Sequence, residues 1–170
     1  MNATLAAWNR AGHAQALDAM IACCGARRWA AAIVALRPIA SVTELSREAD
    51  RAWDTMREPD WLEAFACHPR IGERKTAAHA GAQSAAWPQQ EQSSASAGGA
   101  KVLGELAEGN RLYEERFGFT YIVCATGKSA EEMLAILKRR LASNRDSELR
   151  EAAEQQRQIM QIRLGKWLVT

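Results

Sequence analysis

The hydrophobic and polar positions of the chain repeat mostly with the period of an α-helix. Apolar side chains recur at intervals of three and four residues, and this spacing collects them on one face of a helix. One segment alone, around 117–127, reads as extended, and it is too short and too isolated to form a sheet. We therefore predict an all-α helical bundle. The predicted helices cover residues 2–24 (one short and one longer helix), 27–36, 42–56, the stretch toward His68, 101–117, 129–141 and 145–164.

Several helix ends carry their own signals. Ser41 followed by Glu44, and Ser129 followed by Glu132, have the spacing of a capping box, in which each side chain accepts a hydrogen bond from the other residue's backbone N–H. Gly25 follows the second helix and is a plausible left-handed stop. These signals fix the predicted boundaries independently of the apolar pattern.

The stretch 61–72 joins an apolar helix to a histidine and then a proline. Trp61, Phe65 and His68 lie at i, i+4 and i+7, so the imidazole points the way the aromatic rings point. Pro69 disfavours the helical conformation for the residue before it, and the helix should end at Cys67 or His68. The carbonyl end of a helix favours the protonated imidazole, which suits a general acid near neutral pH. A buried, hydrogen-bonded structural histidine is the alternative.

The amino-acid composition changes after the histidine motif. Residues 73–99 are rich in Ala, Gly, Ser and Gln, with Pro88 in the middle and almost no large aliphatic side chains. A loop of this length inside a compact domain is usually functional or mobile. Trp87 and the polar cluster 89–92 favour a long active-site loop over a tether.

The extended segment and the last helix supply further candidate binding groups. A lone extended segment leaves backbone N–H and C=O groups unpaired by a neighbouring strand, and these groups are available to a ligand. Arg163 falls on the inward face of the last helix, where a guanidinium needs an anion from the protein or from a substrate, unless it reaches the surface near the helix end. Arg139, Arg140 and Arg145 are interpreted as an ordinary excess of positive charge near a helix C-terminus.

Composition narrows the class of protein. The 170 residues, nearly half of them hydrophobic and many of them Ala, favour a single helical domain covering 1–170. The formal charge of +2, with acids and bases interleaved, gives no basic face for nucleic acid or a membrane surface. No apolar run approaches the ~20 residues of a membrane span, and no secretory signal is visible at the start. A cytoplasmic location is the expectation.

The spacing of the Cys and His residues favours neither a metal site nor a catalytic cysteine. The four cysteines form no CxxC pair, and His68, His79 and Cys67 do not form a metal set, so no metal is predicted and reduced thiols are expected. A Cys67 nucleophile paired with His68 is disfavoured, because adjacent residues on a helix point about 100° apart.

Several motifs together resemble one family. They are Trp61-Leu62-Glu63-Ala64-Phe65, His68-Pro69-Arg70-Ile71-Gly72, Trp87 with Glu91-Gln92, Asn110-Arg111-Leu112-Tyr113 leading to Phe117-Gly118-Phe119, Ile162-Arg163-Leu164, and Cys23-Cys24-Gly25 with Arg28-Trp29. In this combination the chain resembles 2-oxo-4-hydroxy-4-carboxy-5-ureidoimidazoline (OHCU) decarboxylase over nearly its whole length. The resemblance implies an all-α fold and a cofactor-free reaction in urate catabolism, in which a small-molecule substrate loses CO2 to give (S)-allantoin.

The resemblance also implies roles for individual residues. His68 matches the catalytic histidine and Glu91 its partner carboxylate, while Pro69 and Gln92 match substrate-contacting positions. Phe119, Tyr121, Ile122 and Val123 belong to the stretch whose backbone holds the substrate ring. The chain departs from many relatives at Pro88, where they carry Ser, so a hydroxyl contact there would be lost.

These roles give a mechanistic hypothesis and leave alternatives open. Protonated His68 would deliver a proton to one face of the ring, Glu91 would orient the substrate, and Arg163 would hold a part of it that remains after CO2 leaves, because a tight grip on the leaving carboxylate opposes the reaction. A non-catalytic helical domain that binds ureides is the second interpretation, and a helical nucleic-acid binder is the third. Trp and Leu side chains near the N-terminal helices could form a two-fold contact, so monomer and homodimer are both open.

Overall fold

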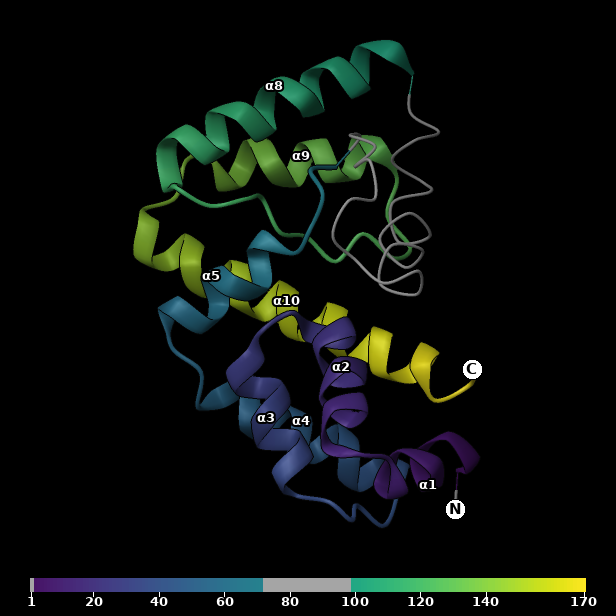
Figure 1. The fold of residues 1–170 in the computed structure, drawn as a ribbon. Helices are drawn as coiled ribbons and strands as arrows, with labels where there is room; N and C mark the ends of the chain where they lie inside the picture. Colours follow the sequence, from purple (N-terminus) through teal and green to yellow (C-terminus); the bar gives the residue numbers. More distant parts are fainter. Residues whose placement is uncertain (1, 72–98) are drawn as a thin grey trace. The chain divides into compact units, whose positions relative to one another are not determined.

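Helices follow one another along the chain in the computed structural model, which describes residues 2–71 and 99–170 (Figure 1). No strand occurs in these two ranges, so the all-α prediction is confirmed. Residues 72–98, with nearly all of the predicted 73–99 loop, lie outside the described residues. The helices are α1 (Ala3–Arg10), α2 (His13–Cys24), α3 (Arg27–Ala35), α4 (Val42–Asp54), α5 (Glu58–Ala66), α8 (Ala100–Phe117), α9 (Ala130–Arg140) and α10 (Arg145–Trp167).

The chain forms two compact units. One consists of Met1–Ala64 and Arg157–Thr170, and the other of Phe65–Gln156. Helices α5 and α10 each contribute residues to both units. The expectation of a single domain over 1–170 stays a prediction.

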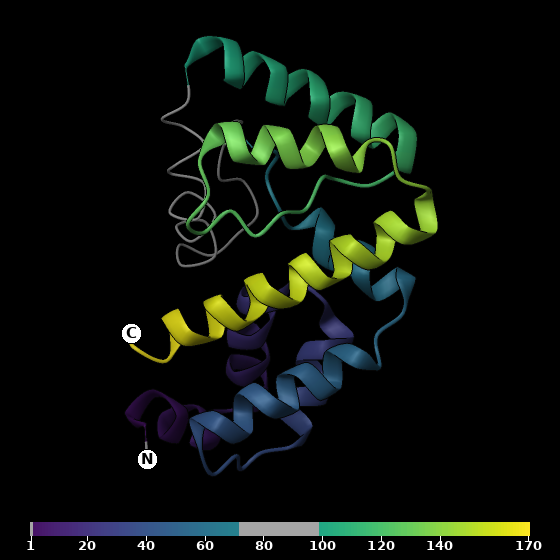
Figure 2. The same ribbon diagram turned by 180° about the vertical axis from the view of Figure 1, so that it is seen from behind.

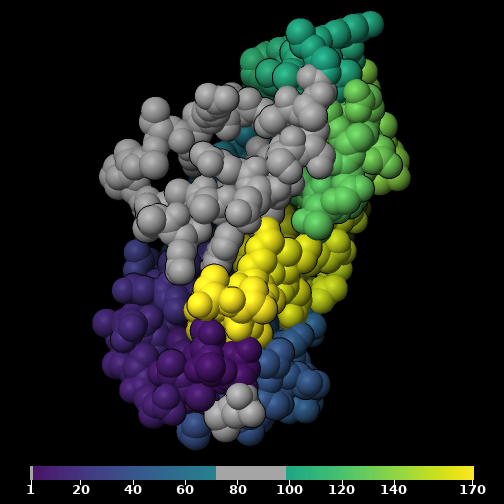
Figure 3. Space-filling model, turned by 90° about the vertical axis from the view of Figure 1, so that its right-hand side faces the viewer, coloured from purple at the N-terminus to yellow at the C-terminus, as the bar shows by residue number. Residues whose placement is uncertain are grey.

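The first unit packs its helices around buried tryptophans. Trp29 of α3 is fully buried, and its indole N–H donates to the Ala49 carbonyl of α4 at 3.0 Å. Trp8 of α1 meets Trp167 edge to face, with ring centroids 6.0 Å apart. Figure 3 shows α1 against the C-terminal end of α10, where Trp8 and Trp167 lie. Indoles with satisfied N–H groups therefore join elements that are far apart in sequence.

The second unit is built on two helices that run in the same direction. Residues 118–129 return along the length of α8 and α9, so that both helices point the same way (Figures 1 and 2). The return begins at Gly118, whose φ of 80° ends α8 in the left-handed conformation that Gly adopts without strain. A Cβ built on Gly109 of α8 would lie 2.6 Å from Cδ2 of Leu137 on α9, so the close approach of the two helices depends on this glycine.

Most predicted helix boundaries agree with the structure. Gly25 ends α2 with φ 90°, and Ser129 and Glu132 form both hydrogen bonds of the predicted capping box. At α4 the Ser41 hydroxyl accepts from the Glu44 N–H as predicted. The Glu44 carboxylate, however, accepts from the N–H of residue 40, one position earlier than a capping box requires.

Two predicted inward positions are wrong. Leu36 is 47% exposed and Val42 is 40% exposed, although both continue the apolar pattern of their helices. Each lies at a helix end, at the C-cap of α3 and the first residue of α4, where the periodic pattern no longer decides which side is covered.

None of the helices described here is both long enough and apolar enough to cross a membrane.

Candidate active site

His68 lies in the turn that follows α5, and the helix ends one residue before the earlier of the two predicted positions, Cys67 and His68. Helix α5 ends at Ala66, and the His68 N–H donates to the Phe65 carbonyl at 3.0 Å, which closes the turn. The histidine is 8% exposed and Pro69 is half-buried. The predicted inward direction of the imidazole is therefore confirmed, while its chemical role stays a prediction.

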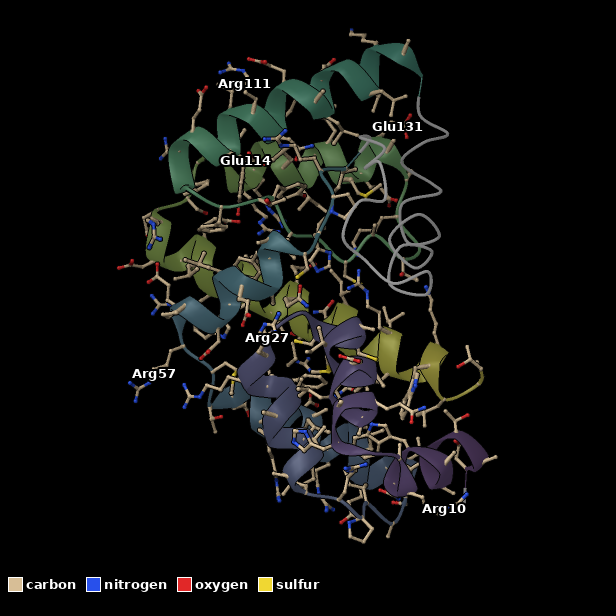
Figure 4. All side chains as sticks on the ribbon, viewed as in Figure 1. Arg10, Arg27, Arg57, Arg111, Glu114 and Glu131 are labelled. Carbon is tan, nitrogen blue, oxygen red and sulfur yellow. The ribbon has the colours of Figure 1, made fainter. Side chains whose placement is uncertain are left out.

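The residues after His68 are fixed to α8. Arg70 forms a two-point ion pair with Glu114, Nε to Oε1 and Nη2 to Oε2 at 2.7 Å each. Figure 4 labels Glu114 on α8. The Asn110 amide donates to the Ile71 carbonyl at 3.2 Å, so this asparagine reaches a distant segment and not the neighbouring backbone that the sequence favoured. The segment after His68 is thus bound to α8 twice, through the side chain of Arg70 and through the backbone carbonyl of Ile71.

The extended segment lies beside the same turn. The Phe65 ring contacts the Phe119 ring with centroids 5.5 Å apart, and Tyr113 meets Phe119 at 5.7 Å. Tyr113 also packs on Tyr121, with centroids 5.2 Å apart. Among the predicted site residues, the structure therefore brings the His68 turn and the start of the 119–123 segment together through Phe65.

The backbone of this segment carries unused donors. Phe119, Tyr121, Ile122 and Val123 are each at most 6% exposed. The amide N–H groups of 119–123 donate no hydrogen bond to any residue of the described chain. Backbone N–H groups without a protein partner are uncommon on buried residues, and a ligand with oxygen acceptors can bind to them.

Other backbone groups of this stretch, at Ile122 and Cys124, form hydrogen bonds with side chains. Arg140 is 3% exposed and donates from Nη1 to the Ile122 carbonyl at 2.7 Å. The Gln155 amide oxygen accepts from the Cys124 N–H at 2.8 Å, and the Lys128 ammonium donates to the Cys124 carbonyl at 2.8 Å. These contacts fix the position of the segment and the orientation of its peptide groups.

Arg140 lies in the basic last turn of α9, as predicted, but its side chain is buried there. Its guanidinium forms a buried ion pair with Glu148, which is 1% exposed and also accepts the Tyr113 hydroxyl hydrogen bond. Burial raises the pKa of the Tyr113 hydroxyl well above its ordinary value of 10, so it donates at neutral pH. The signal was in the sequence: Arg140 lies seven residues after the inward Met133 and belongs to the same helix face.

Arg163 belongs to the first unit and is 4% exposed, so the alternative in which it reaches the surface is wrong. Its positive charge acts on the fully buried thiol of Cys23. Burial raises the pKa of that thiol to about 12, and the nearby guanidinium moderates the rise. Arg163 is thus a buried cation, as its place on the inward stripe predicts.

The remaining predicted groups are outside the described residues. Glu91 and Gln92, and with them Trp87, Pro88 and His79, lie in the range 72–98. No group of three or more His, Cys, Asp or Glu side chains in the described ranges is placed to hold a metal ion. Among the predicted site residues, the described part of the chain contains a buried histidine and backbone amides without a protein partner, within an all-α fold.

Comparison with known proteins identifies the family. The model of the OHCU decarboxylase family matches residues 9–165. A uric acid degradation bifunctional protein of Arabidopsis thaliana is 37% identical over 145 residues, which are 85% of this chain and 44% of that protein. The OHCU decarboxylase of Amia calva is 31% identical over 146 residues, which are 79% of this chain and 77% of the relative. The chain belongs to the OHCU decarboxylase family.

Solved structures agree with this assignment. A crystal structure of OHCU decarboxylase in the presence of (S)-allantoin superimposes with a TM-score of 0.76 and 34% identity, covering 90% of this chain and 99% of that one. An (S)-allantoin synthase superimposes with a TM-score of 0.69 at 17% identity, over 96% of this chain and 53% of that one, and shows the shared fold alone. The present chain spans less than half the length of the Arabidopsis protein.

Proposed function

We propose that this protein catalyses the decarboxylation of OHCU to (S)-allantoin in urate degradation. Family membership over residues 9–165 supports the reaction. The observation that carries the site is the contact between Phe65 and Phe119, which sets the His68 turn beside buried amides that donate to no described residue. A ring with several oxygen acceptors matches such a row of donors.

The substrate itself carries the electron sink. When the bond from the ring carbon to the carboxylate breaks, CO2 leaves and the electron pair moves into the ring, toward the adjacent C=N group. The ring nitrogen that receives this electron pair takes up a proton, which the enol hydroxyl can supply as it becomes a carbonyl. A second proton is added to the carbon that bears the ureido group, so the reaction consumes one proton overall. The protein therefore has to hold the ring and deliver one proton to one face, and no cofactor is required for either step.

His68 is the proposed proton donor. Its backbone is held by the turn before Pro69, and the residues that follow are bound to α8 through Arg70 and Ile71. A fixed imidazole can present its proton to a single face of a bound ring, which accounts for one stereoisomer of the product. General acid catalysis of this kind contributes roughly 10²–10⁴-fold to the rate.

The other proposed contacts bind and orient. Amides of the 119–123 segment that face the ring would hold a ring oxygen and stabilise negative charge that develops on it. Glu91 would accept a hydrogen bond from the substrate hydroxyl or a ureido N–H, and Gln92 and Pro69 would contact the ring. Arg163 would bind the ureido carbonyl, a group that stays in the product, because gripping the carboxylate would stabilise the ground state.

The test is turnover of freshly generated substrate, followed by the circular dichroism of (S)-allantoin. The wild-type protein should form it faster than the spontaneous reaction, and His68→Asn should lose roughly 10²-fold or more of the rate. Glu91→Gln tests the carboxylate in the same assay. A His68→Asn protein as fast as wild type would remove the proton-donor role, and a folded wild-type protein that binds ureides without turnover would favour the ligand-binding alternative.

A further inference from the structure

We infer that Arg140 is a positioning residue for the substrate: its guanidinium holds the Ile122 carbonyl and thereby turns the amides of Tyr121 and Val123 toward the bound ring. The inference rests on the proposed function, because Arg140 would act on the substrate of that site through the backbone of residues 121–123. It starts from a buried cation whose contacts include the backbone of the candidate binding segment.

Arg140 contacts an anion, a hydroxyl group and the segment, and its Nη2 donates to the Tyr113 hydroxyl oxygen at 3.4 Å. Nε donates to the Glu148 carboxylate at 2.6 Å, and Nη1 donates to the Ile122 carbonyl at 2.7 Å. The guanidinium carbon lies 4.9 Å from the centroid of the Tyr121 ring. The Tyr113 hydroxyl completes the group by donating to Glu148. One planar cation therefore links α9, the start of α10 and two successive residues of the segment.

An ion pair alone would not require this arrangement. Glu148 neutralises the charge of Arg140, and Tyr113 satisfies a further carboxylate lone pair. The bond to Ile122 uses an additional donor of the rigid guanidinium fork, at the short distance expected of a charged donor. A carbonyl held in this way cannot rotate without losing a charge-assisted hydrogen bond in a buried place.

The direction of the free amides follows from the alternation of an extended chain. Successive residues of such a chain point their backbone groups to opposite sides. The Ile122 carbonyl and both backbone groups of Cys124 are taken by Arg140, Gln155 and Lys128, which therefore occupy one side. The N–H groups of Tyr121 and Val123 face the other side, and neither donates to a described residue.

The experiment separates positioning from simple stability. Removing Arg140 alone would leave Glu148 as a buried unpaired charge, so the main variant is Arg140→Met with Glu148→Gln, which removes both charges and the donor to Ile122. Tyr113→Phe is the matched control, because it deletes the hydrogen bond to the same carboxylate and the long 3.4 Å bond from Arg140 Nη2, and it leaves the bond from Arg140 to Ile122. Arg140→Lys keeps a cation without the planar fork.

The readouts are KM, kcat and the dissociation constant of (S)-allantoin, with ¹⁵N amide shifts of Tyr121 and Val123 during the titration. In the double variant KM and the dissociation constant should each rise about five- to ten-fold, the loss expected for misdirected hydrogen bonds. Tyr113→Phe should stay within two-fold of wild type, and Arg140→Lys should fall between them. A merely unstable protein would lose active molecules and therefore kcat, with KM and the dissociation constant unchanged.

Several results would overturn the inference. They are a folded double variant that binds and turns over like wild type, amide shifts of Tyr121 and Val123 that survive in it, and a Tyr113→Phe variant that is equally impaired. If the double variant does not fold, Arg140→Lys decides, since unchanged KM and allantoin binding in that protein would contradict the positioning role. A wild-type protein that neither turns over OHCU nor binds (S)-allantoin would instead refute the proposed function.

Discussion

The closest approach of α8 and α9 provides a sharp test of the packing that supports the site. Gly109 lies on α8 against the fully buried Leu137 of α9. In Gly109→Ala the new Cβ would start 2.6 Å from Leu137 Cδ2 and 3.3 Å from Cγ. Optimal carbon contacts are about 3.5–4.0 Å, so the methyl group arrives roughly 1 Å too close. Either the leucine leaves its rotamer or the two helices separate.

The magnitude follows from two opposing effects. Replacing Gly by Ala inside a helix stabilises it by about 0.5–1 kcal/mol, and overpacking a filled core costs about 1–3 kcal/mol. Gly104 is on the same helix, and a Cβ there would meet nothing within 4 Å. Gly104→Ala should therefore gain about 0.5–1 kcal/mol, whereas Gly109→Ala should lose about 0.5–2 kcal/mol. The two variants carry the same chemical change.

The assay is urea unfolding followed by far-ultraviolet circular dichroism, with thermal melts alongside. At about 2–4 °C per kcal/mol, the melting temperatures of the two variants should differ by about 5 °C. In a Leu137→Ala background the penalty at Gly109 should disappear, since the space that the methyl group needs is then open. A Gly109→Ala protein as stable as Gly104→Ala would refute the close-packing argument.

Three further predictions concern thiols, charge and helix capping. Under native conditions only the exposed thiol of Cys67 should react quickly with a thiol reagent. Burial raises the pKa of the Cys23 thiol to about 12, so this thiol should react only after unfolding. Rapid labelling of Cys23 in the native protein would contradict its burial. The ion pair with Arg70 lowers the pKa of Glu114 below its ordinary value of 4.5, so its stabilisation is present above that pH and is lost as the pH falls through the lowered pKa. Arg70→Gln should therefore cost up to about 1 kcal/mol at pH 7 and nothing in strong acid, and a pH-independent difference in urea unfolding would exclude the pair as its cause. Ser129→Ala should destabilise the protein by about 1 kcal/mol in the same assay, and an unchanged unfolding midpoint would mean that the capping box contributes nothing.

Helical periodicity was sufficient to predict the fold class and most helix boundaries. Every helix seen in the described ranges was expected within a few residues, because each carries either a clear apolar stripe or a capping residue. The errors at Leu36 and Val42 fall at helix ends. There the exposure of a side chain depends on which other element passes nearby, and a local pattern contains no such information.

The site was predictable to the extent that it depends on local signals. The direction of His68 and the burial of Arg163 both follow from helix faces, and both are seen. The burial of Arg140 was missed although the same rule applies to it, because the residue was interpreted only as part of an excess of positive charge near a helix C-terminus. Its partner Glu148 comes from another helix, and the Asn110 bond to Ile71 crosses 39 residues of sequence, so neither pairing could be deduced from spacing.

The lone extended segment explains why a buried ion pair lies beside the candidate binding segment in this helical fold. A strand within a sheet satisfies its polar groups on both edges, whereas a single segment among helices has no neighbouring strand on either edge. Side chains take over one edge here, through Arg140, Gln155 and Lys128. Burying a guanidinium for this purpose requires an anion, and Glu148 supplies it at the cost of a second buried charge. Such an arrangement is costly for stability alone, and the proposed positioning role accounts for it, because it would keep the amides of the second edge fixed in direction for the oxygens of a ligand.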